Sequence, residues 1–236
     1  MPKYNRILLK LSGEALAGSK RFGIDHDAVA RICEGIRDVA ADGVQVGIVV
    51  GGGNFWRGRD AGNMERTRAD HIGMLATVMN GLAVAEGLEE LGAQVRVMTA
   101  IPMQSVAEPY IRSRAIRHLE KGRIVILSCG TGNPYFSTDT ASALRAAEIG
   151  AEAIFKATLV DGVYNKDPHK YDDAVRYSTV SFSEVLASNL GVIDSTAASM
   201  CRDNKIPVLV FDLQSDPHNL VRAVNGEDIG TIITEE

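Results

Sequence analysis

Short apolar runs rich in isoleucine and valine recur along the chain, and each has the length of a buried β-strand. Segments in which apolar residues repeat at helical spacing separate these runs. Strands that alternate with helices build parallel sheets covered on both faces. The pattern therefore predicts an α/β fold, a three-layer α/β/α sandwich with a largely parallel central sheet. The predicted strands are residues 6–11, 44–50, 94–99, 123–129, 153–157 and 207–211.

Two of the separating segments carry clear helix signals. Asp25 can cap a helix whose apolar residues repeat at helical spacing and which ends at Gly43. A long helix is predicted from about Thr67 to Leu91, with a glycine directly after it as the stop signal. No linker, charge block or repeat divides the chain, so residues 1–236 are expected to form a single domain.

Composition and charge narrow the classes of protein that the sequence fits. A hydrophobic content of 45% over 236 residues is enough to build a full core. The net charge of −5 argues against nonspecific nucleic-acid binding, which needs a basic surface, so any phosphate site must be a local basic cluster. The apolar run at residues 7–11 is too short for a signal peptide or a membrane span. We therefore expect a cytoplasmic protein without membrane contact.

Cysteine and histidine usage points away from disulfides and from a metal held by protein side chains. The three cysteines are far apart and odd in number, so they are expected to be buried small side chains. The five histidines lack the spacing of metal ligands.

Candidate chemistry lies in the loops after the strands, where parallel sheets bind their ligands. The first predicted strand ends at Lys10, and the turn at Gly13 lets backbone N–H groups approach an anion. Residues 13–20 imitate a Walker A loop, but Ser19 precedes Lys20, whereas that loop needs lysine before serine or threonine. We therefore reject a P-loop. The local sequence alone is equally compatible with Lys10 being a solvated lysine at the end of a strand.

The second predicted strand leads directly into three glycines, Gly51, Gly52 and Gly53. Each costs roughly 0.5–1 kcal/mol of conformational entropy relative to alanine, so a close approach of the backbone to a ligand is expected rather than a packing role. Arg57 and Arg59 follow, and guanidinium groups suit phosphate oxygens. The alternative is a flexible surface loop.

Residues 130–139 combine glycines, hydroxyls, an amide and two aromatic rings. Such a mixture is suited to hydrogen bonding with the edge of a base while stacking on its face. The alternative for Thr138 or Asp139 is a plain helix N-cap, which explains one residue and not the whole loop.

Two further positions have the chemistry of nucleoside recognition. Asp70, near the start of the long predicted helix, can hold ribose hydroxyls or simply cap the helix. Tyr164 lies among hydroxyl and carboxylate neighbours in residues 156–168 and can hold an adenine, although the local sequence establishes only turns.

In this order, the motifs resemble the amino-acid-kinase superfamily and, within it, the bacterial UMP kinases. The resemblance spans essentially the whole chain. It rests on KLSGEAL from Lys10, FGID from Phe22, GGGN from Gly51, DHIGMLATVMN from Asp70, GTGNPYFSTD from Gly130 and KAT from Lys156 with the DGVY and DP that follow. The activity that it implies is transfer of the γ-phosphoryl group of ATP to UMP.

The resemblance also implies roles for individual residues. The expected catalytic residues are Lys10, Arg57, Asp139 and Lys156. The expected ATP site comprises Lys10, Leu11, Ser12, Gly13, Gly53, Arg57, Thr158, Tyr164 and Asp167. The expected UMP site comprises Gly52, Asp70, Thr131, Gly132, Asn133, Pro134, Tyr135, Phe136, Ser137 and Thr138. The N-terminal part of the chain thus holds mainly UMP, and the C-terminal part mainly ATP.

The implied reaction explains the residue types of the site. The UMP phosphate has a second pKa of about 6 and is largely dianionic at neutral pH, so no general base is needed. Lysines, an arginine and glycine amides suit the task of bringing two polyanions together. Mg²⁺ is expected to arrive with ATP, held chiefly by phosphates and water.

Assembly and regulation are implied by the resemblance alone. It suggests a homohexamer that acts in pyrimidine nucleotide biosynthesis, with GTP as activator and UTP as inhibitor. The segment expected to be allosteric is Phe22, Gly23, Ile24 and Asp25.

Two other functions stay open at this point. One is a related kinase that phosphorylates a small carboxylate or carbamate, which has no need of a base-reading loop. The other is a nucleotide sensor without catalytic activity, although such a protein need not keep every charged residue at the transfer point.

Overall fold

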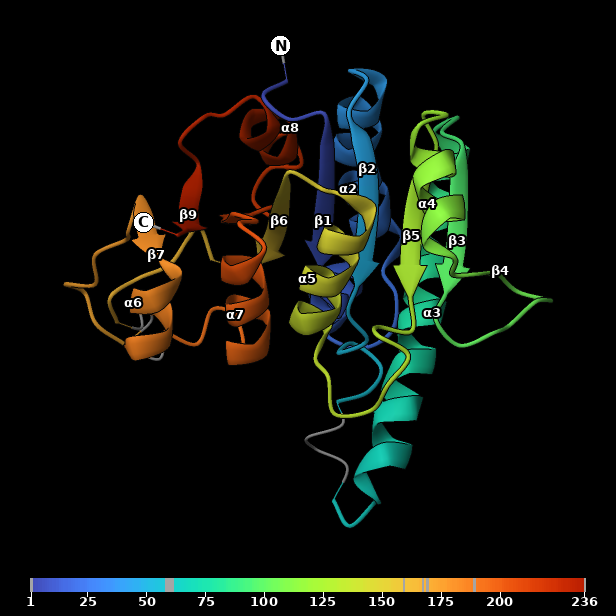
Figure 1. The fold of residues 1–236 in the computed structure, drawn as a ribbon, viewed down its shortest axis with the longest axis horizontal. Coiled ribbons are helices and arrows are strands. Elements are labelled where there is room, and N and C mark those ends of the chain that lie inside the picture. The colour runs from blue at the N-terminus through green and yellow to red at the C-terminus, as the bar shows by residue number, and fades with distance from the viewer. Residues whose placement is uncertain are drawn as a thin grey trace.

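A nine-stranded sheet runs through the residues that the computed structural model describes, which are 2–57, 62–158, 160–166, 168, 170–188 and 190–235 (Figure 1). The strand order is β4-β3-β5-β2-β1-β6-β8-β9-β7, and only the β8–β9 pair is antiparallel. The strands are β1 (Arg6–Leu11), β2 (Gln45–Val50), β3 (Val95–Thr99), β4 (Glu108–Pro109), β5 (Ile124–Ser128), β6 (Ala153–Thr158), β7 (Thr179–Ser181), β8 (Val208–Asp212) and β9 (Gly230–Thr234).

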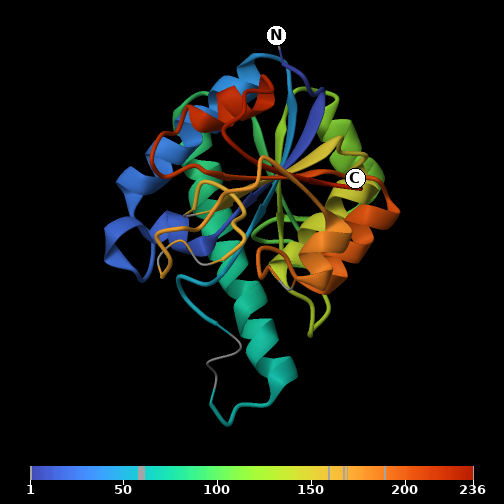
Figure 2. The ribbon, with the colours of Figure 1, turned by 90° about the vertical axis from the view of Figure 1, so that its left-hand side faces the viewer.

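Helices cover both faces of this sheet (Figure 2). One face packs against α1 (Gly13–Ala17), α2 (His26–Ala41), α3 (Arg66–Glu90) and α8 (Asn219–Val224). The other face packs against α4 (Arg112–Leu119), α5 (Thr138–Ile149), α6 (Phe182–Ala187) and α7 (Ser195–Asp203). A short 3₁₀ helix, Gly18–Lys20, follows α1. The predicted α/β/α sandwich with a largely parallel sheet is confirmed.

Alternation along the strands decides which side chains face which helical layer. In β1, Ile7 and Leu9 pack with the α2 layer, whereas Leu8 packs with the α5 layer. Lys10 follows Leu8 by two residues and therefore points to the α5 layer. By the same alternation, Lys156 in β6 shares the face of Ile154, which packs with α5. The strand register thus directs two lysines to one side of the sheet.

The two predicted helices lie where the periodicity places them. Asp25 is the N-cap of α2, and its Oδ1 accepts from the backbone N–H groups of Asp27 (3.1 Å) and Ala28 (3.2 Å). The long helix is α3, which extends beyond the carboxyl ends of the strands (Figure 1). The sequence analysis did not predict β4, β7 and β9.

The three cysteines, Cys33, Cys129 and Cys201, are all buried and free, as predicted. Burial raises the pKa of the Cys33 and Cys201 thiols to about 12, so both are protonated and inert at neutral pH. Among the helices of the described residues, none has both the length and the apolar character that a bilayer span requires.

Candidate active site

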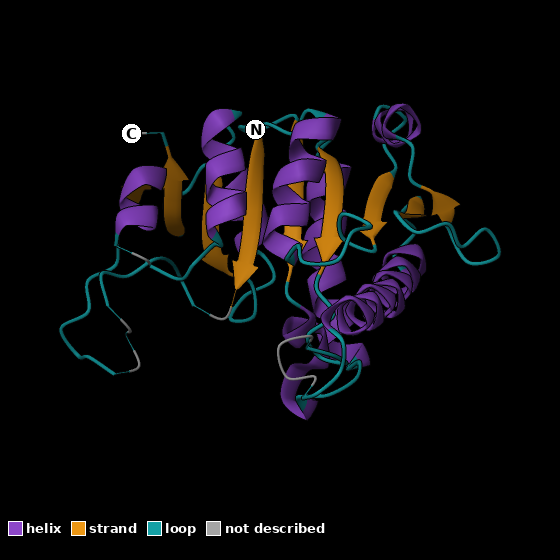
Figure 3. Ribbon diagram, turned by 60° about the horizontal axis from the view of Figure 1, so that its bottom comes forward, coloured by secondary structure: helices purple, strands orange, loops and turns teal. Residues whose placement is uncertain are grey.

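The carboxyl ends of β1 to β6 and of β8 point to one edge of the sheet, where the connecting loops gather, whereas β7 and β9 run in the opposite direction (Figure 3). Lys10 in β1 lies directly opposite Lys156 in β6. Asp139, in the first turn of α5, lies between the two ammonium groups. Lys10 Nζ is 3.2 Å from Asp139 Oδ1, and Lys156 Nζ is 2.5 Å from Asp139 Oδ2. Three residues far apart in the sequence therefore form one cluster, the Lys–Asp–Lys cluster.

The charges of this cluster are largely shielded from water, since the three side chains are only 10–17% exposed. Burial by itself disfavours the carboxylate of Asp139, but the ammonium groups of Lys10 and Lys156 outweigh it and hold the pKa of Asp139 below its usual value. Burial lowers the pKa of Lys156, and Asp139 partly offsets this effect. The cluster thus places two amino groups around one carboxylate, an excess of basic groups that suits an anion.

A second carboxylate, Asp194, supports the cluster from α7. It is the N-cap of α7, and its Oδ1 accepts from the backbone N–H of Ala197 (3.0 Å). It also accepts hydrogen bonds from the hydroxyls of Ser137 and Thr140 at the start of α5. Lys156 Nζ donates to the backbone carbonyl of Val192, two residues before Asp194. This support was not predicted from the sequence, in which the one local signal is an acidic residue in front of a helix.

The start of α5 is capped by Ser137 and by neither Thr138 nor Asp139. The hydroxyl of Ser137 accepts from the backbone N–H of Thr140 (3.0 Å). The alternative in which Thr138 or Asp139 is a plain N-cap is therefore wrong. Because another side chain satisfies the helix terminus, the Asp139 carboxylate is free to contact the lysines.

Close backbone packing surrounds the glycines after β1 and β2. A Cβ added to Gly13 would lie 2.5 Å from Asn54 Oδ1 and 2.9 Å from the carbonyl oxygen of Gly51. One added to Gly52 would lie 2.8 Å from the carbonyl oxygen of Gly73 in α3, whereas one added to Gly53 would meet the carboxylate of Glu14, the end of a flexible side chain. The expectation that packing does not explain these glycines is therefore wrong for Gly52, and for Gly51 and Gly53 the approach of a ligand stays a prediction.

The turn after β1 presents mainly backbone to the site. Leu11 is fully buried in the core, and its carbonyl accepts from the backbone N–H of Gly51 (2.9 Å). Ser12 is the N-cap of α1, and its hydroxyl accepts from the backbone N–H of Ala15 (3.2 Å). Leu11 can therefore contact a ligand only through its main chain.

Arg57 forms an ion pair with Glu14 in α1, with 2.5 Å between Nη2 and Oε1. Its side chain remains 58% exposed, so it is accessible to a ligand. The sequence analysis did not select Glu14, although it lies in the first turn after Lys10. Arg59, the other arginine of this loop, lies outside the described residues.

A buried pair of amides ties the β2 loop to α3. Asn54 donates to Asn80 Oδ1 (3.0 Å), and Asn80 donates to Asn54 Oδ1 and to the carbonyl of Gly51, both at 2.7 Å. Asn54 also donates to the carbonyl of Gly23 (2.7 Å), while Phe22 beside it is 68% exposed. The segment expected to be allosteric thus contacts the glycine loop directly.

Asp70 meets the loop of residues 129–137 between β5 and α5, the β5–α5 loop. Its Oδ2 accepts from the backbone N–H of Tyr135 (2.8 Å) and from Arg66 Nε (2.8 Å). The helix cap is Glu65, so the capping alternative for Asp70 is wrong. The structure therefore brings together residues of two motifs that the resemblance assigns to UMP.

The β5–α5 loop offers both polar groups and rings. Thr131 Oγ1 accepts from the backbone N–H of Asn133 (3.1 Å) and donates to its carbonyl (3.2 Å). Gly132 has a φ of 83°, and Tyr135 has a φ of 72°, which is uncommon for a residue with a side chain. The rings of Tyr135 and Phe136 are 66% and 51% exposed, and Pro134 lies between the amide and the rings. The surface is open to a stacking ligand.

The loop after β6 is closed by local hydrogen bonds. Thr158 Oγ1 accepts from the backbone N–H of Val160 (3.2 Å) and donates to its carbonyl (2.7 Å). Tyr164 donates its hydroxyl to Asp161 Oδ1 (2.7 Å), and this hydrogen bond raises the pKa of Tyr164. Asp167 lies outside the described residues.

Comparison with known proteins places this architecture in a family. Residues 5–212 match the model of the amino acid kinase family. The chain belongs to this family.

Three solved structures are similar to this amino acid kinase over nearly its whole length. UMP kinase from Bacillus anthracis is 39% identical, with a TM-score of 0.96 and coverage of 100% of this chain and 98% of that one. UMP kinase from Ureaplasma parvum is 35% identical, with a TM-score of 0.93 and coverage of 98% and 99%. Uridylate kinase from Archaeoglobus fulgidus is 28% identical, with a TM-score of 0.75 and coverage of 99% and 100%.

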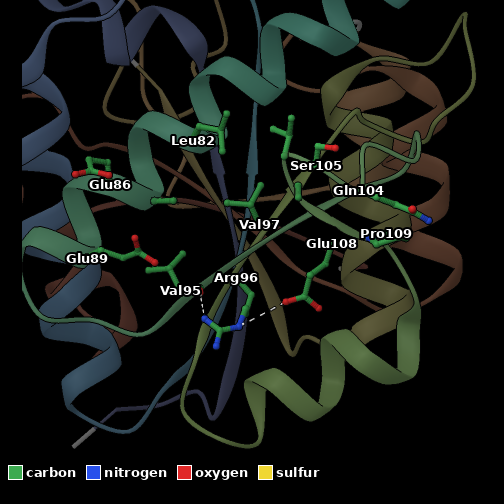
Figure 4. Close-up of a pocket in the computed structure, with 13 residues that line it drawn as sticks. Leu82, Glu86, Glu89, Val95, Arg96, Val97, Gln104, Ser105, Glu108 and Pro109 are labelled. Carbon is green, nitrogen blue, oxygen red and sulfur yellow. Dashed lines mark hydrogen bonds and ion pairs between the residues drawn. The ribbon is translucent and has the colours of Figure 1, made fainter.

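A separate cavity of about 570 Å³ lies on this amino acid kinase, between α3, β3 and residues 104–109 (Figure 4). Arg96 and Glu108 approach each other at its wall, with 3.5 Å between Nε and Oε1. None of the predicted site residues lines it. The cavity is therefore separate from the Lys–Asp–Lys cluster.

Proposed function

We propose that this amino acid kinase transfers the γ-phosphoryl group of ATP to UMP, giving UDP and ADP in pyrimidine nucleotide biosynthesis. The observation that carries the proposal is the Lys–Asp–Lys cluster, in which two shielded ammonium groups face the loops at the carboxyl edge of the sheet. The choice of UMP follows the two bacterial UMP kinases that share the fold and more than a third of the sequence.

In the proposed reaction, an oxygen of the UMP phosphate attacks the γ-phosphorus of ATP in line. The new oxygen–phosphorus bond forms as the bond from the γ-phosphorus to the bridging oxygen of the β-phosphate breaks, and ADP leaves. No proton has to be removed, because the attacking phosphate is already largely dianionic near its second pKa of about 6. The protein therefore contributes positioning and charge stabilisation.

Each member of the cluster has a distinct part in this reaction. Lys10 stabilises charge on the transferring γ-phosphoryl group, and Lys156 neutralises charge that develops on the side of the β-phosphate. Asp139 holds both ammonium groups at a fixed separation through its two oxygens. Arg57 clamps phosphate oxygens once a phosphate replaces Glu14 as its partner.

Mg²⁺ bound with ATP would supply charge neutralisation at the β- and γ-phosphates. Within the described residues, no group of three or more His, Cys, Asp or Glu side chains could hold a metal ion. Both oxygens of Asp139 already contact lysines. These features fit an ion whose ligands are phosphate oxygens and water, with Asp139 near it.

Nucleotide binding is proposed to divide between the two parts of a single domain of residues 1–236. The N-terminal part, with the β5–α5 loop, binds mainly UMP, and the contact of Asp70 with Tyr135 supports a shared site for ribose and base. The C-terminal part binds mainly ATP, with Tyr164 and Thr158 beside the end of β6. The assignments to individual residues are those that the resemblance implies.

We further propose a cytoplasmic homohexamer that GTP activates and UTP inhibits. Leu75, Met79 and Leu82 recur at helical spacing on α3 and are 39–49% exposed, a pattern that supports an interface on this helix. The contact of Gly23 with Asn54 supports a regulatory role of residues 22–25, because it connects them to the glycine loop.

The test of the proposed function is an acceptor panel with Mg-ATP, in which product is identified by chromatography. UMP, CMP, dUMP and acetylglutamate are compared with and without GTP. We expect UDP from UMP, weaker or no turnover of CMP and dUMP, and none of acetylglutamate. Phosphorylation of acetylglutamate would support the carboxylate kinase instead, and failure to form UDP at any UMP concentration would favour a nucleotide sensor.

A further inference from the structure

Arg145 is a buried cation that the proposed phosphoryl transfer does not use. It lies on α5 and is 5% exposed. Nη1 donates to Glu148 Oε2 (2.6 Å), and Nη2 donates to the backbone carbonyl of Gly130 (3.1 Å). The guanidinium carbon lies 4.0 Å from the centre of the Tyr110 ring. Both terminal nitrogens and the face of the guanidinium group therefore have specific partners.

The partners of Arg145 are themselves fixed. The Tyr110 hydroxyl donates to the same carboxylate oxygen, Glu148 Oε2, at 2.6 Å. Burial and this hydrogen bond raise the pKa of Tyr110, so the hydroxyl stays protonated and keeps donating. Arg112 Nε donates to the backbone carbonyl of Glu148 (2.5 Å). The Tyr110 ring and the Glu148 carboxylate therefore hold the guanidinium group of Arg145 in place.

Gly130 begins the turn from which the β5–α5 loop departs. Cys129 has a φ of 66° and Gly130 a φ of 57°, so two consecutive residues adopt the left-handed conformation. This conformation is unfavourable for a residue with a side chain such as Cys129 and persists only where the surroundings hold it. Thr77 Oγ1 in α3 accepts from the backbone N–H of Cys129 (2.8 Å), and Arg145 binds the carbonyl of Gly130.

We propose that Arg145 is a positioning residue for the acceptor nucleotide, because it fixes the carbonyl of Gly130 and with it the direction of the β5–α5 loop. The inference rests on the proposed function, in which this loop binds UMP. An arginine fork serves a carboxylate, a carbonyl and a ring face at once. A lysine has a single nitrogen and cannot reproduce this arrangement.

The test is the Arg145→Lys variant, which keeps the charge beside Glu148 and loses the bond to Gly130. The control is Arg6→Lys. Arg6 also binds a backbone carbonyl, that of Ile149 (2.5 Å) at the C-terminal end of α5, away from the β5–α5 loop. Both variants lose an arginine that holds a backbone carbonyl, and only Arg145→Lys loses contact with the loop. The readouts are the KM for UMP and for ATP, and the Kd for UMP in the absence of ATP.

Loss of a hydrogen bond from a charged donor changes a binding constant by about tenfold or more. We therefore expect Arg145→Lys to raise both the KM and the Kd for UMP about tenfold. The KM for ATP should change less than about twofold, and Arg6→Lys should leave the Kd for UMP unchanged. Unchanged UMP binding in Arg145→Lys would overturn the inference, as would an equal loss of affinity for both nucleotides.

A milder variant covers the case in which Arg145→Lys does not fold. Tyr110→Phe keeps the ring and removes only the hydroxyl that holds Glu148. It should weaken UMP binding in the same direction and leave ATP binding unchanged, and a Tyr110→Phe protein with wild-type UMP affinity would overturn the inference. A wild-type protein that binds UMP without forming UDP would contradict the proposed function. The affinities of the variants for UMP would still test whether Arg145 positions the β5–α5 loop.

Discussion

Asp139 is the residue that joins the two lysines of the candidate active site, because each of its oxygens contacts a different ammonium group. Without it, Lys10 and Lys156 would face each other across neighbouring strands as like charges. The sequence placed all three residues at strand or helix ends, but it left Asp139 open between a catalytic role and a helix cap. The hydroxyl of Ser137 excludes the helix cap, and nothing in the local sequence predicts which of three adjacent polar residues caps the helix.

The lowered pKa of Asp139 predicts how its contribution to stability depends on pH. The carboxyl of Asp139 binds its proton more weakly in the folded protein than in the unfolded protein, in which its pKa is 3.8. Its contribution is therefore fully present above pH 3.8 and is lost as the pH falls through the lower folded-state pKa. Asp139→Asn removes one partner of a buried ionic cluster, so it should cost about 3–5 kcal/mol at neutral pH.

Urea unfolding of wild type and Asp139→Asn over a range of pH measures this difference. We expect a constant difference in unfolding free energy from neutral to mildly acidic pH and a smaller one under strongly acidic conditions. A difference that grows as the pH falls would show that the folded state raises the pKa of Asp139. That result would contradict the charge arrangement of the cluster.

At the scale of elements, β9 holds the loop that is proposed to bind ATP. Thr231 in β9 is fully buried, and its hydroxyl accepts from the backbone N–H of Val163 (2.8 Å) and donates to the carbonyl of Tyr177 (2.5 Å). Thr231→Val keeps the shape and leaves two backbone groups without a partner, so we expect a loss of about 1–3 kcal/mol of stability.

The matched variant Thr231→Ser keeps the hydroxyl and should retain most of the stability. If β9 positions the loop around Tyr164, Thr231→Val should also raise the KM for ATP more than the KM for UMP. Thermal unfolding and steady-state kinetics of both variants test this. Equal behaviour of the valine and serine variants would exclude the hydroxyl as the reason for the position of the loop.

Much at the scale of elements was predictable, and the exceptions have physical causes. The main strands and the helices α2 and α3 follow from apolar periodicity, because each buries a stripe or an alternating face. Strands β4 and β7 span two and three residues, too few for any period to appear. The packing role of Gly52 was missed because the sequence reveals the freedom of a glycine but not the neighbouring carbonyl, here that of Gly73, which leaves no room for a Cβ.

At the scale of the whole molecule, the carboxyl edge of the sheet unites loops that the sequence keeps up to about 150 residues apart, as Lys10 and Lys156 show. The rule that parallel sheets bind ligands at this edge selected, from the sequence, loops that the structure brings together there. The contact of Val192 with Lys156 and those of Asp194 with the start of α5 were not predictable. They depend on how α7 packs beside α5, and neither residue belongs to a recognisable motif.

The exposed apolar face of α3 predicts how the molecule assembles. Met79 is 49% exposed in the middle of this face, so Met79→Glu places a charge where an interface would exclude water. Sedimentation analysis should show a smaller assembly for this variant than for wild type. The control is Val175→Glu, a change of the same kind at a residue that is 63% exposed outside α3. Equal assembly of all three proteins would contradict an interface on α3.

The central claim is that the Lys–Asp–Lys cluster transfers a phosphoryl group to UMP. The most direct measurement is the rate of UDP formation at saturating UMP and Mg-ATP for wild type and Lys10→Ala, with circular dichroism to confirm folding. The account predicts UDP from wild type and a kcat lowered by about 10²–10³ in a folded Lys10→Ala protein, because a preorganised charge at the transferring group is lost. A folded Lys10→Ala protein with a near-normal kcat would contradict it.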